Sequence, residues 1–163
     1  MILERGNMFD VWGKTDLFLF TSNPIVNKEG LAVMGRGIAL QLADRYPQIR
    51  KDFGRYLQVW WPRLHYKCEA LGVYDNQNVG YFMVKDHWAE PAKLSIIEES
   101  VESLMGFLSD DERRVDLNFP GIGNGKLRRE DVLPIIQRLP DKVHVWEYDC
   151  LLYTSDAADD TPC

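Results

Sequence analysis

Two glycine-rich segments are the part of this sequence best suited to chemistry, because each lies between a strand pattern and a helix pattern. Residues 35–37 read Gly-Arg-Gly, and residues 121–125 read Gly-Ile-Gly-Asn-Gly. Glycine lets the backbone approach an anion, and the free N–H groups of a helix's first turn point toward negative charge. Two such loops at the carboxyl edge of one sheet could enclose a diphosphate. The pair therefore predicts a nucleotide site.

The elements on either side of these loops follow from hydrophobic periodicity. An apolar strand pattern at residues 17–21 precedes the first loop, and a helix pattern at about residues 37–46 follows it. The second loop lies between a strand pattern at residues 115–119 and a helix pattern at residues 132–139. Both loops are thus predicted to follow the carboxyl end of a strand.

The remaining elements complete an alternation of strands and helices. We expect a first strand at residues 1–5, a short element at 51–57, a hairpin of strands at 70–74 and 79–84, a helix at 92–108 and a final strand at 142–148. Trp60-Trp61-Pro62 interrupts any helix there, since proline lacks an N–H and restricts the residue before it. This order predicts an α/β fold, a three-layer α/β/α sandwich around a mixed sheet.

Composition limits the possible functions. A chain of 163 residues fits one domain, and a net charge of -6 argues against a general nucleic-acid binder, which would need a basic face. No apolar run reaches the length of a membrane span, and the first residues lack the basic and apolar regions of a signal peptide. We therefore expect a cytoplasmic protein, in the host cell if it is encoded by a phage.

Cysteine and histidine usage gives no sign of a metal or a disulfide framework. The three cysteines and three histidines are Cys68, Cys150, Cys163, His65, His87 and His144. They form no CxxC pair and no ligand cluster, and an odd cysteine count suits a reducing compartment. We predict no metal and no cofactor.

The last residues look foreign to the domain. Residues 150–159 match what one reading frame of a common sequencing adapter would encode. We expect residues 1–149 to form the domain, and residues 150–163 to be a non-native, adapter-derived or disordered acidic tail.

The order of the motifs resembles the macro domain family. The matching segments are Gly6-Asn7-Met8-Phe9, Asn23, residues 33–39, Lys85-Asp86-His87-Trp88 and residues 121–125. The sequence is similar to small stand-alone macro proteins of phages and bacteria and to antitoxin macro domains that remove ADP-ribose from DNA. The resemblance implies the same three-layer fold and binding of ADP-ribose or a derivative, which some members hydrolyse.

The resemblance also implies a set of site residues. The ligand-binding residues would be Asn7, Met8, Asn23, Met34, Gly35, Arg36, Gly37, Ile38, Pro120, Gly121, Ile122, Gly123, Asn124 and Gly125. Lys85 and His87 would be catalytic. Lys85 matches a lysine of the antitoxin type, whose amine could attack an anomeric carbon or polarise a leaving group if its pKa is lowered. His87 could act as acid or base, although a histidine beside a tryptophan is more often packed.

Two asparagine positions leave alternatives open. Asn7 stands where the family commonly has an aspartate that binds adenine, so it could hold the base without charge, with Asp10 as a substitute, or be a turn residue. Asn23 matches the asparagine directed at the distal ribose, with Asn27 as an alternative; either could instead cap a turn.

The second loop also differs from hydrolytic relatives, because it lacks an acidic residue. Glu130 and Asp131 suit the first turn of the next helix, where they complement its dipole. Lys126, Arg128 and Arg129 favour binding of an anion over hydrolysis by a carboxylate.

Three functions remain. The first is binding of an ADP-ribose-class nucleotide, as in a phage protein that sequesters an ADP-ribose-derived immune signal. The second is an ADP-ribose-1''-phosphate phosphatase or ADP-ribosyl hydrolase, and the third is a non-catalytic scaffold with a protein partner. The sequence favours binding, closely followed by hydrolysis, with nucleic acid expected only as an ADP-ribosylated substrate.

Overall fold

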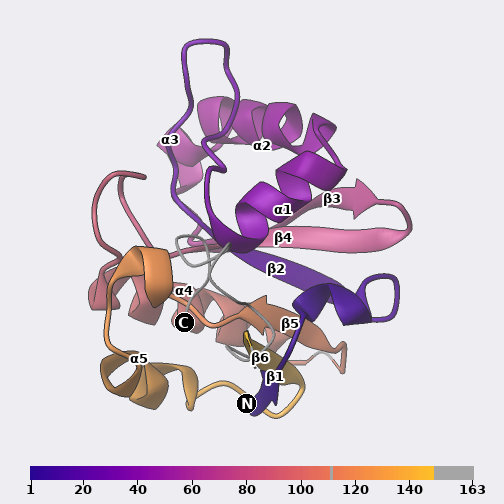
Figure 1. The fold of residues 1–163 in the computed structure, drawn as a ribbon, viewed down its shortest axis with the longest axis vertical. Coiled ribbons are helices and arrows are strands. Elements are labelled where there is room, and N and C mark those ends of the chain that lie inside the picture. The colour runs from indigo at the N-terminus through magenta and orange to yellow at the C-terminus, as the bar shows by residue number, and fades with distance from the viewer. Residues whose placement is uncertain (111, 149–163) are drawn as a thin grey trace.

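A six-stranded mixed sheet forms the centre of the computed structural model, which describes residues 1–110 and 112–148 (Figure 1). Its strands are β1 (Ile2–Arg5), β2 (Leu17–Ser22), β3 (Cys68–Tyr74), β4 (Gln77–Met83), β5 (Val115–Asn118) and β6 (Val143–Glu147). They lie in the order β1-β6-β5-β2-β4-β3. Only β3 and β4 pair antiparallel, as the predicted hairpin requires. The predicted tail at residues 150–163 lies outside the described residues.

Helices cover both faces of this sheet, which confirms the predicted three-layer architecture. One face carries α1 (Gly37–Arg45), α2 (Gln48–Val59) and α3 (Trp61–Leu64), and the other carries α4 (Leu94–Leu108) and α5 (Arg129–Ile136) (Figure 1). Two short 3-10 helices, η1 (Met8–Val11) and η2 (Gly123–Gly125), complete the order. Among the described residues, no helix combines the length and apolar character that crossing a membrane requires.

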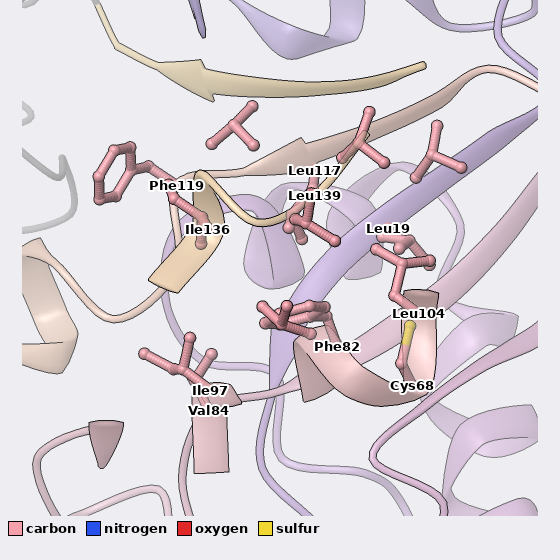
Figure 2. Close-up of a cluster of buried hydrophobic side chains, with 14 of the residues drawn as sticks. Leu19, Cys68, Phe82, Val84, Ile97, Leu104, Leu117, Phe119, Ile136 and Leu139 are labelled. Atoms are coloured by element: carbon pink, nitrogen blue, oxygen red, sulfur yellow. The ribbon is translucent and has the colours of Figure 1, made fainter. Parts of the chain in front are cut away.

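The core has two halves because β2 is buried on both sides. Phe18 and Phe20 pack with α1 and α2, whereas Leu17 and Leu19 pack with α4 and α5. Figure 2 shows the second half, where Leu19 lies among side chains of α4 and of neighbouring strands. Side chains alternate between the two faces of a strand. A central parallel strand therefore reads as a continuous apolar run rather than an alternating one.

Several boundaries differ from those predicted. The short element expected at 51–57 is the 12-residue helix α2, because Ile49, Phe53 and Leu57 recur every four residues and are buried. The expected interruption at Trp60 is present, but a short helix resumes with Pro62 in its first turn, where its missing N–H costs nothing. Helix α5 begins at Arg129, three residues before the expected start.

Two neighbouring strands send the chain to opposite faces of the sheet. After β2 the chain enters α1 on one face, and after the parallel neighbour β5 it enters α5 on the other. Such a switch point leaves a crevice outside the carboxyl ends of the two strands. Both glycine-rich loops lie there.

Candidate functional site

A cavity of about 690 Å³ lies at the carboxyl ends of β6, β5, β2 and β4. Its size is within the range that small-molecule sites occupy. Most of the predicted site residues line it: Asn23, Met34, Gly35, Arg36, Gly37, Ile38, Lys85, Gly121, Ile122, Asn124 and Gly125. The predicted convergence of the two glycine loops is therefore present in the structure.

Asn7 and Met8 do not line this cavity. The Oδ1 atom of Asn7 accepts the N–H of Phe9 at 3.0 Å and so caps η1, while the Met8 side chain is buried in the core. Asn7 is therefore a turn residue, the second of the two interpretations of its sequence position. The proposed substitute, Asp10, is exposed and also lies outside the cavity lining.

His87, Pro120 and Gly123 are also absent from the lining. The Nδ1 atom of His87 accepts the N–H of Ala89 at 3.0 Å, so this ring holds a turn together. Pro120 is buried, and Gly123 opens η2 with a φ of 65°. The structure thus gives His87 a positioning role in the loop rather than a place in the cavity.

The first glycine loop is braced by α2 and by Asn23. Arg50 donates from Nη2 to the carbonyl of Met34 at 3.3 Å, and its own carbonyl accepts the N–H of Ala32 at 2.9 Å. Asn23 donates to the carbonyl of Val33 at 3.2 Å. In the described part of the chain, no group accepts the N–H of Gly35. That N–H and those of α1's first turn are placed to bind an anion.

The two candidate asparagines both stabilise this loop while lining the cavity. Asn23 accepts the N–H of Ile25 at 2.9 Å, and Asn27 accepts those of Glu29 and Leu31 at 3.0 and 2.9 Å. The turn-capping interpretation is confirmed for both residues. Contact of Asn23 with a distal ribose stays a prediction.

The second glycine loop packs closely against α4. Gly121 has a φ of 80°, and a Cβ there would lie 2.7 Å from Cδ1 of Ile97. The carbonyl of Gly125 accepts the N–H of Ala92 at 2.9 Å, which ties this loop to the segment that carries Lys85. The glycines here allow a close approach that a side chain would prevent.

Lys85 follows β4 and is only 8% exposed, so it is not the solvated charge that a lysine at a strand end usually is. Its Nζ donates to the carbonyl of Trp88 at 3.3 Å. Burial lowers the pKa of Lys85, and the nearby charge of Lys126 lowers it further. A lysine in this state has a larger fraction of neutral amine, the form that acts as nucleophile or base.

Comparisons with known proteins agree with this geometry. No protein-family model matches the chain. A curated relative, the DNA ADP-ribosyl glycohydrolase of Mycobacterium tuberculosis, is 29% identical over 142 residues, which are 80% of this chain and 39% of the relative. The same enzyme of Mycobacterium bovis gives identical figures. The chain thus spans about two fifths of the length of these relatives.

Solved structures with the same fold are macrodomains. The macrodomain of Mycobacterium tuberculosis DarG is 26% identical with a TM-score of 0.67, over 90% of this chain and 97% of that one. The macrodomain of Thermus aquaticus DarG is 22% identical with a TM-score of 0.66, over 91% of this chain and 97% of that one. Thermosipho africanus DarTG, solved in complex with ADP-ribose, is 16% identical with a TM-score of 0.69, over 99% of this chain and 45% of that one. The chain has the macro-domain fold.

The cavity of this macro-domain fold is cationic although the chain as a whole is acidic. Arg36, Lys85 and Lys126 line it, and Glu90 is the one acidic residue among its described lining residues. Arg128 and Arg129 do not contribute, which corrects the predicted basic cluster: Arg128 pairs with Asp131 and Arg129 with Glu147. As predicted, Glu130 and Asp131 lie in the first turn of α5.

Several residues that line the cavity were not predicted as site residues from the sequence. Asn118 donates to Thr21 Oγ1 at 2.8 Å and accepts the Thr21 N–H at 3.0 Å, which joins β5 to β2 beside the cavity. Trp146 and Tyr148 line the side at the end of β6. Trp88, which belongs to the matched segment Lys85–Trp88 and was expected in the core or at the rim, lines the side beyond β4. Their position in the sequence could have identified them, since all of them lie at or after the carboxyl ends of strands. Within the described residues, no group of acidic, histidine or cysteine side chains is arranged to hold a metal ion.

Proposed function

We propose that this macro domain binds an ADP-ribose-class nucleotide across the carboxyl ends of β6, β5, β2 and β4. The observation that carries the proposal is the order of chemical groups along this edge. Aromatic side chains lie at the end of β6, glycine loops follow β5 and β2, and Lys85 follows β4. The four strands β6, β5, β2 and β4 are neighbours in the sheet, so the edge from β6 to β4 spans three strand spacings, or about 14 Å.

This order matches the three parts of the ligand. Trp146 and Tyr148 offer aromatic surface for the adenine base. The two glycine loops supply N–H groups and local positive charge for the diphosphate. The distal ribose would then reach Lys85 and Asn23. One structural relative was solved with ADP-ribose, which supports this class of ligand.

A second candidate function is removal of an ADP-ribosyl group, favoured by the burial and lowered pKa of Lys85. A neutral amine can form a bond to the anomeric carbon while the bond to the leaving group breaks, and water can then release the ribose. The curated relatives are DNA ADP-ribosyl glycohydrolases. A 1''-phosphate could leave in the same way.

Sequestration of an immune signal and a scaffold role are narrower forms of binding. Both require the nucleotide to remain intact after it is bound. A phage protein that removes a defence signal would release unchanged ligand when it is denatured. A scaffold would in addition need a protein partner that contacts the nucleotide-bound form.

Calorimetry with ADP-ribose and NAD, followed by chromatography of the recovered ligand, tests these functions. We expect ADP-ribose to bind more tightly than NAD, and a chain that binds neither would contradict the proposal. Lys85→Ala then separates the candidates, with ADP-ribosylated DNA as the substrate. For a binder it weakens affinity by about 1 to 2 kcal/mol, whereas for an enzyme it abolishes turnover and leaves affinity largely intact.

A further inference from the structure

Trp88 is an exposed aromatic residue at the edge of the cavity. It lines the cavity, yet 52% of it is accessible to solvent. Its ring stacks on that of His87, with centroids 5.4 Å apart and planes 29° apart. A large indole that remains this exposed beside a ligand site offers a surface for a second planar group.

The segment that carries Trp88 is held in place by its own hydrogen bonds. The Trp88 carbonyl accepts from Lys85 Nζ at 3.3 Å, and the His87 carbonyl accepts the N–H of Glu90 at 3.1 Å. The N–H of Ala92 is bonded to Gly125 at 2.9 Å. The backbone that carries the indole is therefore held in place before any ligand arrives, and the His87 ring stacks on the indole, so that little ordering is required when a ligand binds.

We propose that Trp88 forms a stacking subsite for a nucleobase joined to the distal ribose of ADP-ribose. The inference rests on the proposed function, because it assumes that the ribose reaches Lys85. Lys85 Nζ is hydrogen bonded to the Trp88 carbonyl and both residues line the cavity, so we expect a group attached to that ribose to reach the indole. Aromatic side chains stack on any base with little dependence on sequence.

The charges around Trp88 indicate one base rather than a long DNA strand. The nearby carboxylates, Asp86 and Glu90, lie 2.5 and 4.0 Å from Lys93 Nζ. These two carboxylates offset the charge of Lys93 on the outer side of the indole, and the chain as a whole carries -6. Tracking of several phosphates requires several unpaired cations and gives strong salt dependence. We therefore expect recognition of the modified nucleotide itself, with little gain from flanking nucleotides.

The experiment compares the affinities for three probes: free ADP-ribose, a short oligonucleotide with one ADP-ribosylated base, and a peptide ADP-ribosylated on an aliphatic side chain. Trp88→Leu removes the aromatic ring, and Trp88→Phe restores one. Trp60→Leu is the matched control, because Trp60 is 48% exposed and does not line the cavity. Chromatography follows turnover in the same samples, and kcat/KM replaces affinity if a probe is cleaved.

Wild type and Trp60→Leu should prefer the oligonucleotide over the peptide by roughly tenfold, as expected for one stacked base. Trp88→Leu should lose that preference while it keeps its affinity for free ADP-ribose, and Trp88→Phe should recover most of it. Equal preference in wild type and Trp88→Leu would overturn the subsite, as would a preference that grows steeply with oligonucleotide length or low salt. Failure of wild type to bind free ADP-ribose would instead overturn the proposed function.

Discussion

Lys85 and Lys126 line the same cavity from two different loops, and the positive charge of Lys126 acts together with burial to lower the pKa of Lys85. Lys85 follows β4, whereas Lys126 ends η2 in a left-handed conformation with a φ of 64°. The second glycine loop thus carries, besides its backbone donors, a charge that changes the chemistry of the first lysine. This coupling makes the pH dependence of any turnover informative.

Lys126→Met should shift the pH dependence of turnover to higher pH. Removal of the Lys126 charge lets the pKa of Lys85 rise toward its ordinary value, so less neutral amine is present at a given pH. The measurement is kcat/KM against pH for release of an ADP-ribosyl group, with the exposed Lys14→Met as control. A rising limb that stays in place or moves to lower pH would contradict a role for neutral Lys85.

Lys85→Met should raise the free energy of unfolding at neutral pH by about 0.5 to 2 kcal/mol, because replacing a buried functional residue by an apolar one often stabilises a fold. The pKa of Lys85 is lower in the folded state than the unfolded value of 10.5, so folding is opposed by protonation of this amine. That cost is fully present below the folded pKa and disappears as the pH rises to 10.5. The gain should therefore shrink in alkaline buffer.

Thermal unfolding at pH 7 and at about pH 10 measures this effect. Lys14→Met is the comparison, because Lys14 is exposed, does not line the cavity and should give little change. A Lys85→Met protein that is less stable than wild type at pH 7 would show that the ammonium contributes to folding.

Gly54→Ala should destabilise the fold and disturb the first glycine loop. A Cβ on Gly54 would lie 2.1 Å from the carbonyl oxygen of Gly30, so α2 or the loop has to move. Overpacking of this kind costs about 1 to 3 kcal/mol. Urea denaturation measures the cost, and Gly106→Ala, where a Cβ meets no atom within 4 Å, should be neutral or stabilising. Equal stability of Gly54→Ala and wild type would refute the close approach.

The parts of the fold that could be predicted are those with a local signal. The loops at Gly35 and Gly121 were identified because glycine clusters lie between a period-2 and a period-3.6 pattern. Helix α4 was predicted because its apolar residues recur at helical spacing. The full length of α2 was not predicted: the helix begins at Gln48, directly after Pro47, and continues to Val59.

The missed site residues depend on strand order, which a single sequence does not contain. Trp146 and Tyr148 alternate correctly for one face of a strand, but only the placement of β6 beside β5 puts them at the cavity. Asn7, in contrast, was predicted as a site residue but does not line the cavity. Its amide suits both base binding and capping, and only the direction of η1 decides in favour of the cap.

The central claim, that a nucleotide lies between the two glycine loops, is tested most directly by the affinity of Gly35→Val for ADP-ribose. Gly35 lines the cavity and has no positive φ, and a Cβ there meets no atom within 4 Å. A valine therefore adds bulk at the cavity lining without straining the backbone, and Gly106→Val is the matched control outside the cavity. Calorimetry should show that Gly35→Val loses at least tenfold in affinity with its unfolding curve unchanged, while Gly106→Val binds as wild type does. Wild-type affinity in a folded Gly35→Val protein would contradict the account.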